Sequence, residues 1–392
     1  MKPHAFLLAA LTCLAAADDA RADAKFRVTP TADGVDVPVF LPADKWNGTA
    51  ELAPEGAANL KAGDAVLVQK VGDQIVFILP KAEAGKTTVW EQPLAKAKAT
   101  EFGFAKEDGK HLDFQFGGQS VLRTMIARDE STKESKFDTA KVFTHVFAPD
   151  GESFLTKGTG GQYPHHRGIY LGWSRTGFGG KKYDTWHCHS GEALRFDKVI
   201  AEEAGPVLGR QTIGVKWTTP SGDPILDEAR TLTLYRQNAG DAIALIDVDT
   251  VLSANYGEVE LNGDPEHAGC QFRPTNEVSE KTKKETKYLF PAEGNDPKKD
   301  RDLPWAGLAF TAGGQRYHVQ HMSHPTIPEG NIYSAYRDYG RFGAFCKTTI
   351  KDGESLRLRY RLYIGKGEMP ERDAFAQRYA AFAEPPKVEV VE

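Results

Sequence analysis

Hydrophobic and polar residues alternate with a period of two along much of this chain. The clearest example covers residues 356–364, where Arg357, Arg359 and Arg361 alternate with apolar residues. Shorter runs of the same kind cover residues 112–116, 231–235 and 243–249. A period of two places one face of a strand in the core and the other in water, as in antiparallel sheets. The pattern therefore predicts an all-β protein.

The runs divide the chain into two β-rich parts. Residues 26–94 hold short apolar runs separated by Gly, Asp and Pro, which predicts a small β-sandwich domain over residues 23–98. Residues 101–364 predict a large antiparallel two-sheet β-sandwich, assigned to a domain of residues 99–385. A helical pattern is confined to residues 372–383. The charged segment 281–302 is predicted to be a long exposed loop.

The N-terminus resembles a secretory signal. Lys2 precedes a largely apolar run of 13 residues, Ala5 to Ala17, which is too short to cross a bilayer, and Ala20 and Ala22 form a small-residue cleavage site. We therefore expect residues 1–22 to be removed and the protein to be periplasmic or secreted. No later segment is apolar enough to predict a membrane span.

Composition adds few constraints. The 392 residues carry 49 Lys+Arg and 54 Asp+Glu, a net charge of −5 that provides no basic footprint for nucleic acid. Three cysteines remain after residue 22, so at most one intramolecular disulfide is expected. We expect Cys188 to be buried. Histidine is unevenly distributed, because nine of the eleven lie between His145 and His324.

Two histidine clusters are the strongest candidates for chemistry. If the segment around His165 continues the apolar strand that follows it, then His165 and Arg167 share one face and His166 points to the other. His187 and His189 are two residues apart, so on a strand both face the same side and can chelate a metal. Trp186 offers an aromatic surface of the kind that sugar rings stack on.

Two further segments place charged and aromatic groups near histidines. Residues 263–274 bring Glu266, His267 and Arg273 around an expected turn, with Asp264 beside them. Residues 317–343 contain three histidines spaced by three, a spacing that fits neither a single strand face nor a helix. His324 precedes a proline, so an extended or turn conformation is expected there.

Five motifs together resemble a family of exported bacterial β-proteins commonly named methane-oxygenase-like, for which no activity is assigned. The resemblance covers roughly residues 60–370, and its motifs are residues 143–151, 165–168, 184–187, 264–269, and 324–325 with 337–343. The family fold is similar to the two-sheet sandwich of aldose epimerases, which implies a sheet-borne cleft lined with His, Arg, Glu and aromatic residues.

The leading hypothesis is an exported carbohydrate-active enzyme that uses His and a carboxylate for acid–base chemistry: elimination, hydrolysis or epimerisation. The predicted catalytic residues are His165, His187, His267 and Glu266. The predicted substrate-binding residues are Arg167, Trp186, His324, Arg337 and Tyr339.

Two alternatives are open. One is an enzyme or binding protein that depends on Zn or another divalent metal, with His187 and His189 as ligands together with His166, His267 or His321. The other is a glycan-binding protein without catalysis. All three hypotheses expect a carbohydrate or other small-molecule partner and no nucleic acid.

Overall fold

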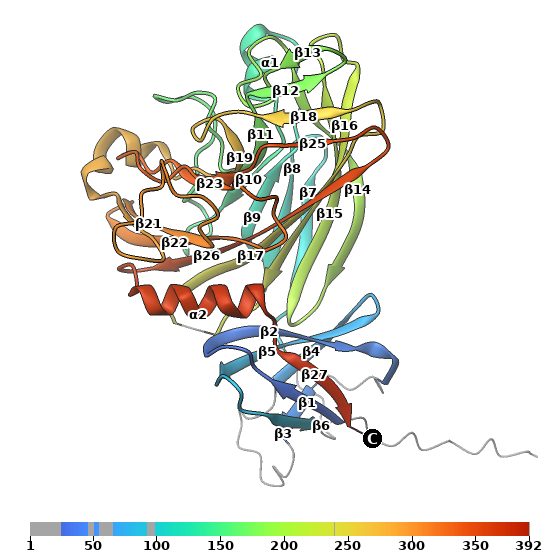
Figure 1. Cartoon of the computed structure of the whole chain (residues 1–392), viewed down its shortest axis with the longest axis vertical. Helices are drawn as coiled ribbons and strands as arrows, with labels where there is room; N and C mark the ends of the chain where they lie inside the picture. The colour runs from blue at the N-terminus through green and yellow to red at the C-terminus, as the bar shows by residue number, and fades with distance from the viewer. Residues whose placement is uncertain (1–24, 46–50, 55–65, 92–98, 239, 392) are drawn as a thin grey trace, which may run out of the picture.

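A computed structural model describes residues 25–45, 51–54, 66–91, 99–238 and 240–391. Strands dominate these residues and form four sheets (Figure 1). The N-terminal part forms a seven-stranded sheet, together with the last strand of the chain. Its strands, in spatial order, are β2 (Gly34–Pro42), β5 (Gln74–Ala82), β4 (Val66–Val71), β3 (Glu51–Pro54), β6 (Thr88–Glu91), β1 (Lys25–Thr29) and β27 (Lys387–Val391).

Two eight-stranded antiparallel sheets form the large domain. The first large sheet consists of β23 (Ile332–Tyr333), β24 (Phe342–Phe345), β19 (Ala268–Phe272), β11 (Ile169–Trp173), β10 (Phe143–Val146), β9 (Gln119–Met125), β8 (His111–Phe116) and β7 (Phe102–Glu107). The second large sheet consists of β14 (Ala193–Ala204), β15 (Leu208–Thr218), β16 (Pro224–Tyr235), β17 (Ala242–Ser253), β26 (Ser355–Lys366), β22 (Gln315–Ser323), β21 (Trp305–Ala312) and β20 (Lys287–Leu289).

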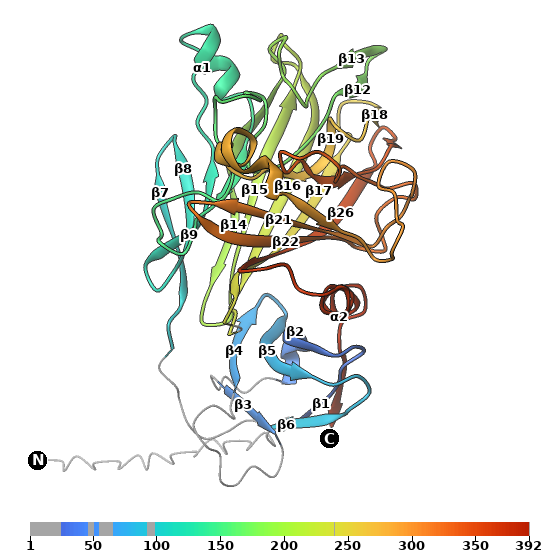
Figure 2. The ribbon, with the colours of Figure 1, turned by 90° about the vertical axis from the view of Figure 1, so that its left-hand side faces the viewer.

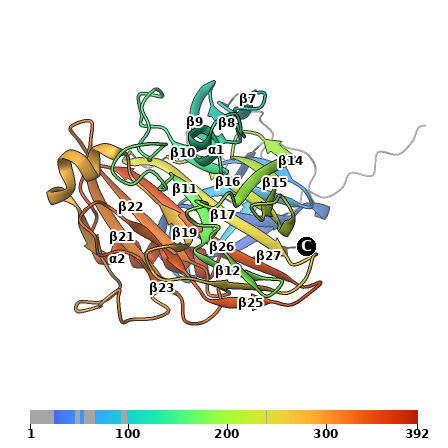
Figure 3. The ribbon, with the colours of Figure 1, turned by 90° about the horizontal axis from the view of Figure 1, so that it is seen from above.

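The main core lies between the two large sheets. Ile169, Leu171 and Trp173 of β11 belong to the same buried cluster as Val215 and Trp217 of β15, and the Trp173 and Trp217 ring centroids are 6.0 Å apart. Seen from above, β7, β8 and β9 lie on one side of the sandwich and β21 and β22 on another (Figure 3). Apolar residues on facing sheet surfaces thus hold the sandwich together.

Smaller elements cover the edges of this sandwich. A four-stranded sheet lies at one end, made of β13 (Lys181–Tyr183), β12 (Arg175–Phe178), β18 (Val259–Asn262) and β25 (Thr348–Ile350). The α-helices among the described residues are α1 (Lys133–Asp138) and α2 (Arg372–Ala383). Figures 1 and 2 show α2 between the seven-stranded N-terminal sheet (the small sheet) and the large domain. Neither helix in the described part of the chain has the length and apolar character needed to cross a membrane.

The structure confirms the predicted two-sheet β-sandwich and the helix at residues 372–383. The prediction of a continuous exposed loop over residues 281–302 is wrong in part, because β20 lies within that segment and pairs with β21. The proposed signal sequence lies outside the described residues. Cys188, Cys270 and Cys346 are all buried and all free, as predicted for Cys188.

The core also contains a buried ion pair. Glu228 of β16 accepts hydrogen bonds from Arg230 Nε (2.7 Å) and Arg230 Nη2 (3.0 Å), from Trp217 Nε1 (2.8 Å) and from Thr250 Oγ1 (2.9 Å). Arg230 Nη1 donates to the Val142 carbonyl oxygen at 3.0 Å, so the pair links the second large sheet to the chain entering β10. Each charged group is satisfied inside the core, as a buried pair requires.

His321 of β22 lies in the core among the rings of Tyr333, Phe342 and Tyr360. Burial lowers the pKa of this imidazole to about 3. In the unfolded chain the same group titrates near pH 6.5, so between about pH 3 and pH 6.5 the unfolded state binds a proton that the folded state does not. His321 therefore costs folding stability as the pH falls below about 6.5.

We expect His321→Leu to reduce this acid sensitivity. Between pH 7 and pH 4 the wild-type protein should lose about 3 kcal/mol of unfolding free energy relative to the variant, because about 2.5 pH units of proton linkage are removed. Urea denaturation of both proteins at the two pH values measures the change. A stability difference that is the same at pH 7 and pH 4 would contradict the assignment.

Candidate functional site

The candidate site lies on the outer face of the first large sheet. The outward side chains Phe143 of β10 and Tyr170 of β11 pack with Trp186 in a small buried cluster separate from the main core. Loops that precede β11, β14 and β19 cover this face and carry His165, His187 and His267 respectively. Three segments that are distant in sequence thus meet at one place.

Two of these loops fold into the same local structure. Each has the sequence Asp-x-x-His, with Asp184 three residues before His187 and Asp264 three residues before His267. Asp184 accepts hydrogen bonds from the backbone N–H of His187 (2.8 Å) and from its Nδ1–H (2.7 Å). Asp264 accepts from the backbone N–H of Glu266 (2.9 Å) and from His267 Nδ1–H (2.9 Å). Each aspartate both closes a turn and fixes an imidazole.

The hydrogen bonds lower the pKa of both carboxyl groups. Burial raises the pKa of Asp184, but the hydrogen bonds from His187 outweigh it and the pKa is lowered overall. The hydrogen bond from His267 lowers the pKa of Asp264. Because Nδ1–H of His187 and of His267 is directed at a carboxylate, Nε2 is the ring nitrogen of each that remains available as a ligand or base.

His165 is held in place by a lysine rather than by a carboxylate. Its carbonyl oxygen accepts a hydrogen bond from Lys141 Nζ at 2.9 Å. Lys141 is buried beside the packed rings of Tyr170 and Trp186, and burial lowers its pKa to about 7. The pKa of His165 is itself lowered to about 2, first by burial and then by the nearby Lys141 charge. His165 is therefore neutral at ordinary pH, and its buried Nε2 has no hydrogen-bond partner in the described structure.

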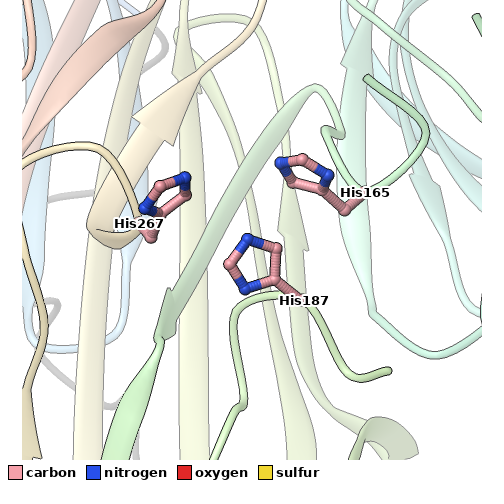
Figure 4. Close-up of side chains that lie close together, drawn as sticks. All are labelled: His165, His187 and His267. Carbon is pink, nitrogen blue, oxygen red and sulfur yellow. The ribbon is translucent and has the colours of Figure 1, made fainter. Parts of the chain in front are cut away.

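The three imidazoles gather around a common space (Figure 4). The His165 and His187 ring centroids are 4.6 Å apart, those of His187 and His267 4.8 Å, and those of His165 and His267 6.3 Å. One ligand atom from each residue lies within 4.8 Å of the other two. All three side chains are half-buried, so the cluster is reachable from solvent.

Two glycines allow this approach of the loops to the sheet. Gly269, the second residue of β19 and two residues after His267, has φ +84°, and a Cβ there would overlap the carbonyl oxygen of Ala344 in β24. A Cβ on Gly168 would overlap the carbonyl oxygen of Thr144 in β10. Only glycine fits at these positions, which bring the His267 and His165 loops against the first large sheet.

The predicted strand geometry of the histidine clusters is wrong. His165, His166 and Arg167 precede β11, which begins only at Ile169. His187 and His189 lie in a turn closed by Asp184, where Cys188 has φ +59°. The metal set predicted as His187, His189 and His166 is therefore not the one that comes together: the described residues form one three-residue group, His165, His187 and His267.

Glu266 lies beside His267 in sequence, but its carboxylate belongs to an ion-pair cluster. It contacts Arg341 Nη1, and accepts hydrogen bonds from Arg337 Nη2 (2.7 Å) and Tyr336 OH (3.2 Å). Burial raises the pKa of Glu266, but the two arginines outweigh it and lower the pKa to about 2. An ionised carboxylate paired with two arginines is a poor proton donor. Arg337, predicted to bind substrate, is itself paired with this carboxylate.

The other predicted substrate-binding residues are placed in supporting positions. Trp186 is fully buried beneath the histidines rather than offering an open surface. Arg167 is 1% exposed and donates to the carbonyl oxygens of His166 (2.8 Å) and Asp138 (3.1 Å). Tyr339 packs on the Tyr163 ring, with centroids 4.4 Å apart. His324 lies elsewhere, on Arg359 of β26 and Phe382 of α2.

Three groups at the site have a supporting role that was not predicted from the sequence. Asp184 and Asp264 are the carboxylates that orient the histidines, and the repeated Asp-x-x-His spacing was the available signal. Lys141 had no such signal, because it is a single charged residue in an apolar segment. Its role depends on contacts with His165 and Trp186, which lie 24 and 45 residues further along the chain.

Comparisons with known proteins add a family and a distant structural likeness. A search of curated protein sequences gave no match. Among solved structures, galactose 1-epimerase from Lactobacillus acidophilus NCFM matches with 8% sequence identity and a TM-score of 0.34, over 69% of this chain and 100% of that chain. The model of a family described as "Family of unknown function (DUF6807)" matches residues 111–380.

Proposed function

Because this chain belongs to DUF6807, a family of unknown function, we propose its function from the site itself. The protein is a divalent-metal-dependent enzyme, most suited to zinc, whose metal is held by His165, His187 and His267. The observation that carries this proposal is the convergence of three imidazoles, two of which donate Nδ1–H to a carboxylate.

The donor set fits zinc chemistry. Catalytic zinc sites commonly have three protein ligands and an open position, and their histidines donate the second ring N–H to a carboxylate or carbonyl. Zinc–nitrogen bonds of about 2.1 Å separate ligand atoms by about 3.4 Å in a tetrahedral site. The three ligand atoms already lie within 4.8 Å of one another, so small side-chain rotations are sufficient.

A bound zinc ion would polarise a substrate oxygen and lower the pKa of a bound water. The protein's own residues then provide orientation and charge. Asp184 and Asp264 hold His187 and His267 in one tautomer, and Lys141 fixes the His165 loop. The predicted sugar or other small-molecule substrate and the export of the protein are retained as parts of this proposal.

The metal-free hypothesis has one observation in its favour. The His187–Asp184 and His267–Asp264 pairs have the arrangement of a general base and its orienting carboxylate. Acid–base chemistry on a sugar needs no metal in that case, and chelation leaves activity unchanged.

Elemental analysis and a substrate screen decide between the metal-dependent and the metal-free hypothesis. We expect the purified full chain to carry about one zinc or other divalent ion per molecule, and to act on a member of a panel of glycosides and uronides. Activity should be lost with a chelator and return with added metal. A metal content far below one per chain after incubation with zinc, together with chelator-resistant turnover, would overturn the metal assignment.

Removing one orienting carboxylate should weaken metal binding without abolishing it. We expect Asp264→Asn to raise the dissociation constant for zinc about 10- to 100-fold, because the amide no longer fixes the His267 tautomer as a charged acceptor does. Competition with a zinc-binding dye measures the constant. Asp150→Asn, a loop-capping aspartate outside the site, is the control, and an equal effect of both changes would contradict the role of Asp264.

A further inference from the structure

The outer face of the second large sheet holds a groove of about 650 Å³. Strands β15, β16, β17 and β26 form its floor. Residues of β2 and β5 from the small sheet, the end of α2 and the two prolines that follow form its walls. The volume is within the range of small-ligand sites. The candidate metal site lies on the outer face of the other large sheet, so the two sites are on opposite faces of the sandwich.

The floor carries two rows of polar side chains across four neighbouring strands. Because adjacent strands are in register and alternate residues share a face, each row holds one residue from each strand. The rows are Arg210, Thr233, Asp247 and Arg361, and, two residues along, Thr212, Thr231, Asp249 and Arg359. The arginine side of the alternating run at residues 356–364 thus faces this groove.

The carboxylates of the groove are already paired. Asp247 accepts two hydrogen bonds from Arg361, at 2.5 and 2.8 Å, and one from Tyr235 OH at 2.9 Å. Asp249 accepts from Arg357 Nε at 2.8 and 3.1 Å. These bidentate contacts satisfy both acids and leave them little capacity for a ligand.

Two arginines retain unused donors. Arg359 Nη1 donates to His324 Nε2 at 2.8 Å, while its Nε is 3.9 Å from Asp249. Arg210 Nε donates to Thr233 Oγ1 at 3.2 Å, while its Nη1 is 3.6 Å from Glu203. Within the described residues, neither arginine has a carboxylate within hydrogen-bonding distance. The groove therefore presents two guanidinium groups beside threonine hydroxyls.

We propose that this groove binds an oligosaccharide bearing carboxylate or sulfate groups. Guanidinium forks recognise both anions through paired hydrogen bonds. The hydroxyls of Thr212 and Thr231 hydrogen-bond each other at 2.8 Å and still hold one donor and free lone pairs for sugar hydroxyls. The half-buried ring of Phe40 at the groove wall provides apolar surface for a sugar ring. His324 acts here as a positioning residue that holds Arg359.

Calorimetric titration of the full chain tests this proposal. The probes are a uronic acid disaccharide, a sulfated disaccharide, the neutral hexose disaccharide and inorganic sulfate. We expect at least one charged disaccharide to bind ten times more tightly than the neutral one, with affinity falling as salt increases. Equal binding of charged and neutral disaccharides, or no binding of either charged probe, would overturn the proposal. If inorganic sulfate bound as tightly as both charged disaccharides, the sugar would contribute nothing to recognition, and the part of the proposal that names an oligosaccharide would be overturned.

Single substitutions test whether the charged disaccharide binds in this groove. Arg359→Gln and Arg210→Gln should each weaken binding of the charged disaccharide at least tenfold, whereas Arg27→Gln, which removes an exposed arginine of the small sheet, should leave it within twofold. His187→Ala should also leave it unchanged, which separates this groove from the metal site and from the proposed function. Loss of binding in His187→Ala with retention in both groove variants would contradict the location. Circular dichroism identifies any variant that fails to fold.

Discussion

Replacing His187 by Ala is expected to reduce the metal content of the protein from about one ion per chain to below about a tenth. His187 is the central member of the cluster, with ring centroids 4.6 Å from His165 and 4.8 Å from His267. Its loss leaves only two histidine ligands, so the effect should exceed the 10- to 100-fold weakening expected for an orienting carboxylate. Plasma mass spectrometry of protein incubated with zinc and then desalted measures the content.

His189→Ala is the matched control for this change. His189 lies two residues further along the same turn and its ring is 5.2 Å from that of His187, yet it is exposed and outside the three-residue group. The control should keep its metal and any chelator-sensitive activity. If both variants lose metal equally, the turn binds metal through a His-x-His pair instead. If neither loses metal, the cluster is not the metal site.

Glu228→Ala is expected to lower the free energy of unfolding by about 3–5 kcal/mol. The change removes the acceptor of four hydrogen bonds and leaves the Arg230 guanidinium charged and unpaired between the two large sheets. Chemical denaturation monitored by tryptophan fluorescence measures it. Glu202→Ala, which removes an exposed-edge carboxylate that accepts from Gln211, should cost less than about 1 kcal/mol.

The double variant Glu228→Met with Arg230→Met tests whether the unpaired charge of Arg230 causes this loss of stability. Removing both charges and replacing them with apolar side chains should be less destabilising than Glu228→Ala alone, because no uncompensated charge remains. A double variant that is less stable than the single one would show that the ion pair itself, rather than the burial of a lone charge, dominates.

The regular parts of the fold could be predicted because their signals are local. Alternation over residues 356–364 identified β26, and the helical pattern at residues 372–383 has the same bounds as α2. Each signal arises from burial of one face of a single element, which a short window of sequence records. The grouping of His165, His187 and His267 could also be anticipated from their density.

The geometry of the site could not be predicted in the same way. His165 and His187 do not lie on strand faces because both lie in turns, and the turn at His187 depends on hydrogen bonds that its backbone N–H and Nδ1–H donate to the Asp184 carboxylate. Glu266 was assigned to catalysis because it adjoins His267, yet its partner Arg341 lies 75 residues further along. Contacts between distant loops leave no periodic pattern in the sequence.

The pairing of β27 with β1 has a consequence for the order of folding. These strands are the last and first described elements of the chain, and five residue pairs join them at the edge of the small sheet. A ribosome releases the chain from its N-terminus, so this edge strand is added only after every strand of the large sandwich has been made. The small sheet therefore cannot reach its final form first, although its sequence comes first. The pairing of β27 with β1 is therefore a late event, which can follow only once the large sandwich between them has been synthesised.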